Sequence, residues 1–198
     1  MSFPLLAQID HVEETKEARE YSEKSLRENK KVDPCLTLYR ASNKVISIHF
    51  PESKNRKEQF QEACFLVSVL NIDCVRLIVD TEMPKSIFFE SALANETIDS
   101  ILCVFGTVDG AFALPFPYVL DHENEFPIWQ DDKFNVNALD FLKKNAMLID
   151  FMTSQFFIAD HIFPWKYYLE YLKDNGYTLE YHHPFTEINI GYGLMPIY

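Results

Sequence analysis

Four carboxylates and one imidazole in the middle of the chain are of the types that hold divalent cations: Asp80, Glu82, Asp109, Asp121 and His122. Asp80 and Glu82 follow an apolar run predicted as a strand, and in open α/β sheets the carboxyl end of a strand commonly faces the ligand crevice. Carboxylates there could bind a metal or divide acid and base roles. One hypothesis is therefore a metal-dependent hydrolase or nuclease-like enzyme.

The spacing of these residues is also compatible with a solvated turn and a solvated loop. It fits neither the calcium loop of an EF-hand nor the two-histidine helix of a zinc protease. His182 and His183 are adjacent on a predicted strand and so point to opposite faces, which favours a surface pair over shared metal ligation. His11 and His49 have no nearby partner pattern.

Aromatic and acidic side chains concentrate between Phe112 and Asp132, inside a segment, 86–132, that contains no Lys or Arg. Aromatic anchors inside a charged rim are typical of protein docking surfaces. The competing interpretation is an ordinary loop beside a core strand, with Trp129 in the core. The predicted partner-binding residues are Phe116, Tyr118, Glu123, Glu125, Phe126, Trp129 and Asp131. The preferred hypothesis is a non-enzymatic interaction or accessory protein whose protein partner carries a basic patch. An acidic DNA-mimicking inhibitor is a narrower variant of this hypothesis.

Charge narrows the classes of partner further. The net charge is -12, and residues 100–198 hold thirteen Asp or Glu against five Lys or Arg. Such a field repels phosphate backbones and anionic lipids, so direct nucleic-acid binding is disfavoured. The chain shows neither a secretory signal nor an apolar run long enough for a transmembrane helix, and its four cysteines form no CxxC pair. We expect buried free thiols, no membrane association and a cytoplasmic setting.

Motifs for nucleophilic or nucleotide chemistry are missing from the sequence. There is no G-x-S-x-G, no P-loop and no dinucleotide glycine fingerprint, and the chain has only five glycines. Loops that cradle phosphate need more glycine locally than this chain offers. No cofactor is expected.

The elements that would position these residues follow from periodicity and turn signals. Residues 11–31 predict a polar helix with Glu20–Lys24 and Glu23–Arg27 pairs. Its apolar stripe is so thin that residues 1–34 are expected to form an exposed arm or a docked lid. Residues 35–198 are expected to form one domain: a hairpin turning at 41–44, a helix from about 53 to 72, strand 74–80, a hairpin turning at Asp109-Gly110, helices near 137–157 and 163–176, and a strand at 177–183.

The predicted fold class is α+β, with a mixed five- to six-stranded sheet built from two hairpins and a crossover strand, and with helices packed on it. The sheet should contain 36–40, 44–50, 74–80, 100–106 and 111–118, with a right-handed crossover placing 74–80 parallel to 44–50. Pro115 and Pro117 should put the last of these at an edge or end it early. The predicted core comprises Phe60, Cys64, Val67, Leu77, Val79, Val104, Leu142, Ile149, Trp165 and Leu169.

The order of elements from residue 33 to 118 resembles a group of uncharacterised small α/β proteins of phages and bacteria. The stretch ISIHFPESKNRKEQFQEACFLVSVLNIDCVRLIVDTEMPK, followed by a second hairpin, carries the resemblance. In that group the central strand often ends in Ser-Glu-Ala-Trp, whereas Asp80-Thr81-Glu82-Met83 keeps the acid and lacks the aromatic residue. The resemblance supports the fold prediction. It implies no particular activity.

Overall fold

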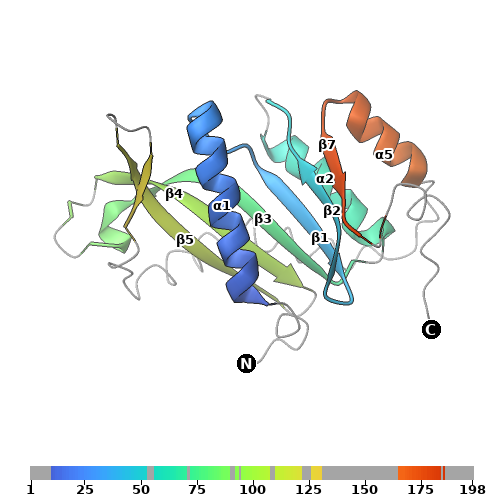
Figure 1. The fold of residues 1–198 in the computed structure, drawn as a ribbon, viewed down its shortest axis with the longest axis horizontal. Coiled ribbons are helices and arrows are strands. Elements are labelled where there is room, and N and C mark those ends of the chain that lie inside the picture. Colours follow the sequence, from blue (N-terminus) through green and yellow to red (C-terminus); the bar gives the residue numbers. More distant parts are fainter. Residues whose placement is uncertain are drawn as a thin grey trace.

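The fold is known from a computed structural model, which describes residues 10–52, 56–70, 72–89, 92–93, 95–107, 110–121, 126–130, 165–183 and 185 (Figure 1). The helices are α1 (His11–Asn29), α2 (Arg56–Val69) and α5 (Trp165–Asp174), with a short 3-10 helix η2 (Lys85–Ile87). The strands are β1 (Cys35–Arg40), β2 (Asn43–His49), β3 (Cys74–Pro84), β4 (Thr97–Thr107), β5 (Gly110–Leu120), β6 (Pro127–Trp129) and β7 (Thr178–Tyr181). The helix predicted near 137–157 lies outside these residues.

The strands form one seven-stranded sheet in the order β6-β5-β4-β3-β1-β2-β7 (Figure 1). Each neighbouring pair is antiparallel, so the α+β class is confirmed and the prediction of a mixed, five- to six-stranded sheet is wrong. Helix α2 does carry the chain from β2 to β3. Strand β3 pairs with β1, with Leu36 opposite Leu77, so β2 and β3 run in the same direction, as predicted, with β1 between them.

All five strands predicted for the sheet are present, and β7 and β6 extend it at its two ends. Strand β5 continues through Pro115 and Pro117 and does not end early. Over residues 110–117 the recorded strand partner of β5 is β4, whereas β6 pairs only with 118–120. The prolines thus occupy the part of β5 where a missing N–H removes no ladder bond on the outer side.

Two hydrophobic cores lie on opposite faces of the sheet, because side chains alternate along each strand. One face packs against α2 and α5, and buries Leu36, Ile46, Leu77, Cys64, Val67 and Leu169 with their neighbours. The other face lies under α1 and buries Tyr39, Ile78, Ile101, Cys103 and Phe105. Six of the predicted core residues are buried: Phe60, Cys64, Val67, Leu77, Val104 and Leu169.

The remaining core predictions have different outcomes. Val79 is only partly buried, because it lies in the portion of β3 that extends beyond the centre of the sheet. Leu142 and Ile149 lie outside the described residues, as does the side chain of Trp165.

Helix α1 is capped at both ends and is closely packed on the sheet. The Asp10 side chain accepts hydrogen bonds from the N–H groups of Val12 and Glu13, and Lys30 closes the carboxyl end in the left-handed conformation. These devices satisfy backbone groups that have no partner inside the helix. Ala18 and Leu26 are fully buried, so this polar helix is docked on the sheet and is not an exposed arm. Small side chains, such as the buried Ser22, allow the close approach.

The turn of the first hairpin is two residues shorter than the predicted turn at 41–44. Ala41 and Ser42 form the turn with positive φ values of 46° and 66°, and Asn43 already belongs to β2. Asn43 still supports the turn, since its side-chain amide donates to the Ala41 carbonyl at 2.9 Å. Asp73 accepts the Ala41 N–H at 2.7 Å and ties the turn to the start of β3.

The cysteine side chains lie in the packed interior of the protein. All four cysteines are buried and free, which confirms the prediction of buried thiols. Burial raises the pKa of the Cys35 thiol to about 11, so its reactive thiolate form is disfavoured. Within the described ranges, no helix combines the length and apolar character that crossing a membrane requires.

Candidate protein-interaction site

The predicted docking aromatics lie on the two-stranded ribbon that β5 and β6 form at one end of the sheet (Figure 1). Tyr118 pairs with Trp129, and Val119 pairs with Ile128. Because consecutive side chains point to opposite faces, Phe116, Tyr118 and Trp129 share the side that packs with the α1 core. Val119 and Ile128 project from the reverse side. The ribbon closes where the Asp121 N–H donates to the Phe126 carbonyl at 2.9 Å.

Tyr118 is buried and is committed to an internal contact. Its hydroxyl donates to both carboxylate oxygens of Asp80, at 3.1 and 3.3 Å. Burial raises the pKa of Asp80 above its ordinary value, although the Tyr118 hydroxyl and the Val32 N–H act in the opposite direction. Tyr118 was predicted to bind a partner, but its ring and hydroxyl are both engaged within the chain.

Trp129 is half-buried and contacts α1. Its indole N–H donates to a carboxylate oxygen of Glu23 at 2.8 Å. The ring packs edge-on against Phe116 and Tyr118, with ring centres 6.4 and 5.8 Å apart. Trp129 therefore combines the two interpretations of the sequence, because part of the ring packs in the α1 core and part remains at the surface.

Helix α1 supplies the cations that the segment 86–132 lacks. The Arg19 guanidinium lies 4.8 Å from the ring centre of Trp129 and 5.6 Å from that of Phe116. The Arg27 guanidinium lies 3.9 Å from the ring centre of Phe126. Guanidinium groups are attracted to aromatic faces at these distances. The aromatic side of the ribbon is thus occupied by the chain's own N-terminal helix.

The ribbon also carries apolar side chains that α1 does not cover. Large exposed hydrophobic residues in the described part of the chain are Val12, Leu93, Val119, Phe126, Ile128, Tyr167 and Tyr171. Three of these seven lie on or beside the ribbon. Val119 is 49% exposed and Ile128 is 51% exposed, and the two are cross-strand partners. Neither residue was among the predicted partner-binding residues. Because side chains alternate along a strand, both must point away from the face that Tyr118 and Trp129 share.

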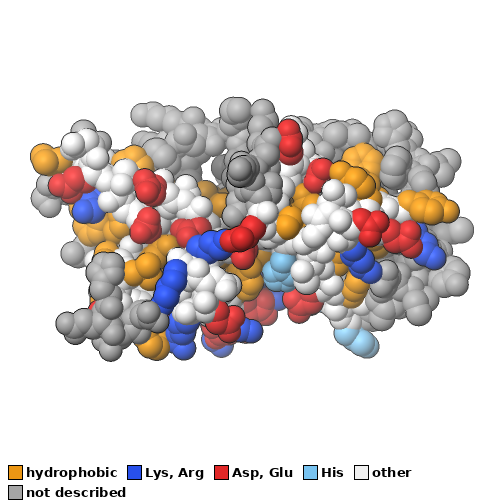
Figure 2. Space-filling model, turned by 90° about the horizontal axis from the view of Figure 1, so that it is seen from above, with side chains coloured by type: hydrophobic (Ala, Val, Ile, Leu, Met, Phe, Trp, Pro, Cys, Tyr) orange, Lys and Arg blue, Asp and Glu red, His pale blue; other side chains and the backbone are white. Residues whose placement is uncertain are grey.

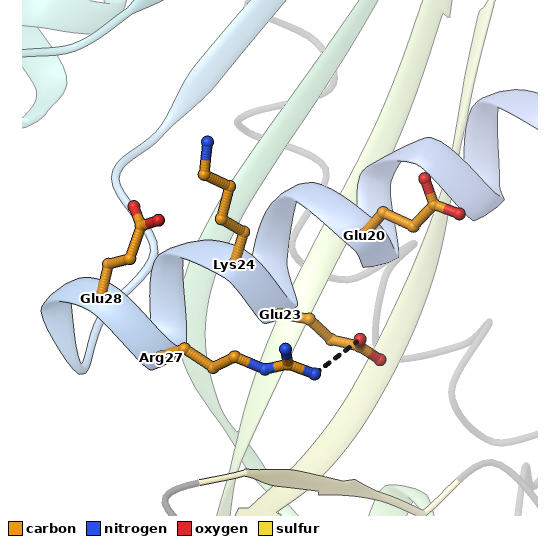
Figure 3. Close-up of a pocket in the computed structure, with 5 residues that line it drawn as sticks. All are labelled: Glu20, Glu23, Lys24, Arg27 and Glu28. Atoms are coloured by element: carbon orange, nitrogen blue, oxygen red, sulfur yellow. Dashed lines mark ion pairs between the residues drawn. The ribbon is translucent and has the colours of Figure 1, made fainter.

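The acidic members of the predicted docking set, Glu123, Glu125 and Asp131, lie outside the described residues. Elsewhere charges of both signs are interspersed, and Figure 2 shows Lys and Arg side chains next to Asp and Glu on the face that it presents. On α1, Glu23 and Arg27 are 3.9 Å apart, which confirms that predicted pair (Figure 3). Glu20 lies 3.9 Å from Lys16, one turn toward the N-terminus of the helix.

The carboxylates of the metal hypothesis do not form a ligand cluster in the described part of the chain, which contains no group of three His, Cys, Asp or Glu able to hold a metal. Asp80 is bonded to Tyr118, and Glu82 is exposed at the far end of β3. Glu82 lies opposite Asp99 of β4, which the sequence analysis did not consider. Asp121 directly follows β5, while Asp109 and His122 lie outside the described residues.

A second group of polar residues, which sequence analysis missed, crosses the sheet under α1. Arg76 of β3 donates to Thr37 of β1 at 3.4 Å, Thr37 lies 3.0 Å from Ser47 of β2, and Ser47 lies 2.8 Å from Nε2 of His182. Strand register brings them together, since Thr37 is opposite both Ser47 and Arg76. The one sign of this row in the sequence was that polar residues occupy matching positions of the predicted strands.

The Ser47–His182 contact has the atoms of a nucleophile and its base, but it is enclosed. Burial lowers the pKa of His182, which favours the neutral imidazole that can accept the Ser47 hydroxyl proton. However, Ser47 is only 5% exposed and Thr37 is fully buried, so a substrate has no access to either hydroxyl. The row therefore satisfies buried polar groups. It also corrects the surface-pair prediction, because His182 is half-buried while His183 is exposed.

Two further polar groups secure α1 over this row. Arg76 donates to the Glu14 carbonyl at 2.9 Å and also pairs with the Glu14 carboxylate. Tyr21 donates to the Asp33 carbonyl at 2.9 Å and lies beside His49, whose Nε2 is 3.4 Å from Glu180. His49 thus has partners from distant elements that sequence spacing could not reveal.

Comparison of the chain with protein-family models, with curated proteins and with solved structures finds no match. The fold and the site define it as an α+β protein with an antiparallel sheet and an aromatic ribbon partly covered by its first helix.

Proposed function

We propose that this chain is a non-enzymatic interaction protein, an accessory factor of the phage type, and that it binds a protein partner through the β5–β6 ribbon. The observation that carries the proposal is the exposure of the cross-strand partners Val119 and Ile128 on one short ribbon. Apolar side chains that a protein leaves exposed together are typical of interaction surfaces.

Charge around the ribbon supports a basic partner. In the sequence, Glu123 and Glu125 lie between β5 and β6, and Asp131 and Asp132 follow soon after β6. Acidic groups at the rim of an apolar patch attract a basic surface and accelerate the encounter, while the apolar contacts slow dissociation. The proposed division is therefore apolar residues for residence time and acids for association rate.

The experiment is affinity capture from the native host with the wild-type chain as bait, followed by measurement of the captured protein's affinity. The test variant is Val119→Thr with Ile128→Thr, because threonine keeps β-propensity while removing apolar contact. We expect affinity to fall at least about fivefold, since interface anchors typically contribute about 1 kcal/mol or more each. Raised salt should slow association.

Tyr167→Ala is the matched control, because Tyr167 is 69% exposed and lies on α5, at the other end of the sheet from the ribbon (Figure 1). It should leave capture and affinity unchanged. Equal capture by wild type and by the Val119 and Ile128 double variant would show that the ribbon is not the docking surface.

A further inference from the structure

The contacts between α1 and the ribbon repeat at one helical spacing. Arg19, Glu23 and Arg27 follow one another at intervals of four residues and therefore share one side of the helix. Arg19 lies over Trp129, Glu23 accepts the Trp129 indole N–H, and Arg27 lies over Phe126. Figure 3 shows Glu23 and Arg27 on one side of α1, and Lys24 and Glu28 on the other.

This contact has the chemistry of an interface between proteins. Trp and Arg are among the residues that contribute most to protein association. The contacting groups of α1 are also accessible to solvent, since 50% of the Arg27 side-chain surface and 37% of that of Glu23 remain exposed. Any helix that presents Arg-x-x-x-Glu-x-x-x-Arg offers the same three groups to the ribbon.

The sheet is assembled without α1. All six strand pairings join strands that follow α1 in the chain. Helix α1 joins the first strand through residues 30–34, which begin with Lys30 at a φ of 59° and end in Asp33-Pro34. Rotation in this connector moves α1 without breaking a strand pair.

Contacts nearer the N-terminus of α1 oppose its release. The buried Glu14 pairs with Arg76, and Ala18 is fully buried against the sheet. A competing helix must displace these contacts as well, so the ribbon is open in only a fraction of the molecules. The apparent affinity for a competitor is reduced by that fraction. Weakening the ribbon contacts of α1 should consequently strengthen binding in trans.

We propose that the α1-facing side of the ribbon is a receptor site for an arginine-bearing amphipathic helix of the partner protein, and that α1 fills this site in the free chain. This inference rests on the proposed function and specifies the chemistry of the partner. The recognised feature is two guanidinium groups, two helical turns apart, with a carboxylate between them.

The test uses the full chain and a labelled synthetic peptide with the sequence of residues 10–31. Each exposed guanidinium–aromatic contact accounts for about a twofold to fivefold change in affinity. The double variant Arg19→Ala and Arg27→Ala should therefore bind the peptide about 5- to 30-fold more tightly than wild type does. Adding Trp129→Ala should abolish the gain. The Arg19→Lys and Arg27→Lys variant, which keeps charge but loses planar stacking, should fall between the two.

Lys16→Ala with Lys24→Ala is the matched control, since it removes two positive charges from exposed positions of the same helix. It should bind the peptide as wild type does. If far-UV circular dichroism shows that the alanine variant is unfolded, the lysine variant supplies the comparison. Peptide affinity that is the same in wild type and the folded arginine variants, or that is unaffected by Trp129→Ala, would overturn the inference.

The peptide assay is independent of the captured partner. Loss of capture in the Val119 and Ile128 variant, together with no peptide effect, would leave the proposed function standing and refute the receptor site. Peptide exchange without any effect of Val119 and Ile128 on capture would refute the proposed docking surface instead.

Discussion

The indole N–H of Trp129 donates to the Glu23 carboxylate at 2.8 Å, although the two residues are 106 positions apart in the chain. The bond joins the second half of the sheet to the first helix. Helix α1 also supplies guanidinium groups to three aromatic side chains of a segment that has no lysine or arginine, namely Phe116, Phe126 and Trp129.

This bond predicts a measurable coupling. Trp129→Phe keeps an aromatic ring under Arg19 and removes the donor, while Glu23→Ala removes the acceptor. We expect a double-mutant cycle from denaturant unfolding to give a coupling of about 0.5–1.5 kcal/mol, the usual range for one hydrogen bond. Glu20→Gln, on the exposed side of α1, should show no coupling to Trp129→Phe. A coupling below about 0.3 kcal/mol would mean that the bond contributes nothing to stability.

The buried pair between Arg76 and Glu14 should be more sensitive to loss of one partner than to loss of both. Arg76 is 5% exposed, and Arg76→Met would leave the Glu14 carboxylate without its main buried partner. Such a change typically costs about 3–5 kcal/mol. Adding Glu14→Met should recover part of that loss, because two apolar side chains need no compensation. Urea unfolding of the three variants measures this, and an additive double variant would contradict the prediction.

Leu77 tests the core between the sheet and α2. It is 2% exposed, and Leu77→Ala should lower the free energy of unfolding by about 2–5 kcal/mol through lost burial and a residual cavity. Val119→Ala removes fewer apolar atoms from a side chain that is 49% exposed, and should cost less than about 0.5 kcal/mol. A Leu77→Ala cost equally small in the same denaturant measurement would place Leu77 outside the core.

The first hairpin offers a stabilising substitution. Ala41 has a φ of 46°, a region that side chains with a Cβ rarely adopt. Ala41→Gly should raise the free energy of unfolding by about 0.5–1 kcal/mol, and its N–H can still donate to Asp73. Ala111→Gly within β5 is the control and should lower stability by a similar amount. Thermal melts of both variants check the signs, and destabilisation by Ala41→Gly would show that the turn is unstrained.

Local signals predicted the elements well, and long-range relationships account for most errors. Apolar alternation and the Asp109-Gly110 step were sufficient to predict β4 and β5. Gly176 follows the end of α5 with a φ of 85°, a conformation for which glycine is the local signal. After α2, β3 could pair with either strand of the first hairpin. The helical connection alone does not decide between β1 and β2. Strand β6 has three residues and includes a proline, too few for a periodic pattern.

The candidate site was also predicted only in part, because its contacts join distant parts of the chain. Composition indicated the aromatic residues of the ribbon, but not that α1 would contact them. Charged residues of α1 look solvated when the helix is considered alone, and only the tertiary fold shows that Arg19 and Glu23 reach Trp129. The row from Arg76 to His182 depends on the register of separate strands and on a residue just past the last of them. Neither relationship has a signature in local sequence.

His182 should make stability depend on pH near neutrality. Burial lowers its pKa below the ordinary value of 6.5, against the attraction of Glu180 and Glu17 and with the repulsion of Lys44 and Arg76. As pH falls below 6.5, the unfolded chain therefore binds a proton at this histidine before the folded chain does. Stability that is fully present above pH 6.5 is consequently lost as pH falls toward the folded pKa. Protonation would also remove the acceptor for the Ser47 hydroxyl.

The measurement is the free energy of urea unfolding between pH 8 and pH 5 for wild type, His182→Gln and His183→Gln. His182→Gln keeps a polar side chain near Ser47 and removes the titration, so its stability should fall less over this interval than that of wild type. His183 is exposed, and His183→Gln should retain the wild-type slope. If the His182 variant and wild type lose stability in parallel, another group must dominate the pH dependence. An opposite sign, with wild type gaining more stability than the variant on acidification, would mean that the folded state favours the charged imidazole and that Glu180 and Glu17 outweigh burial.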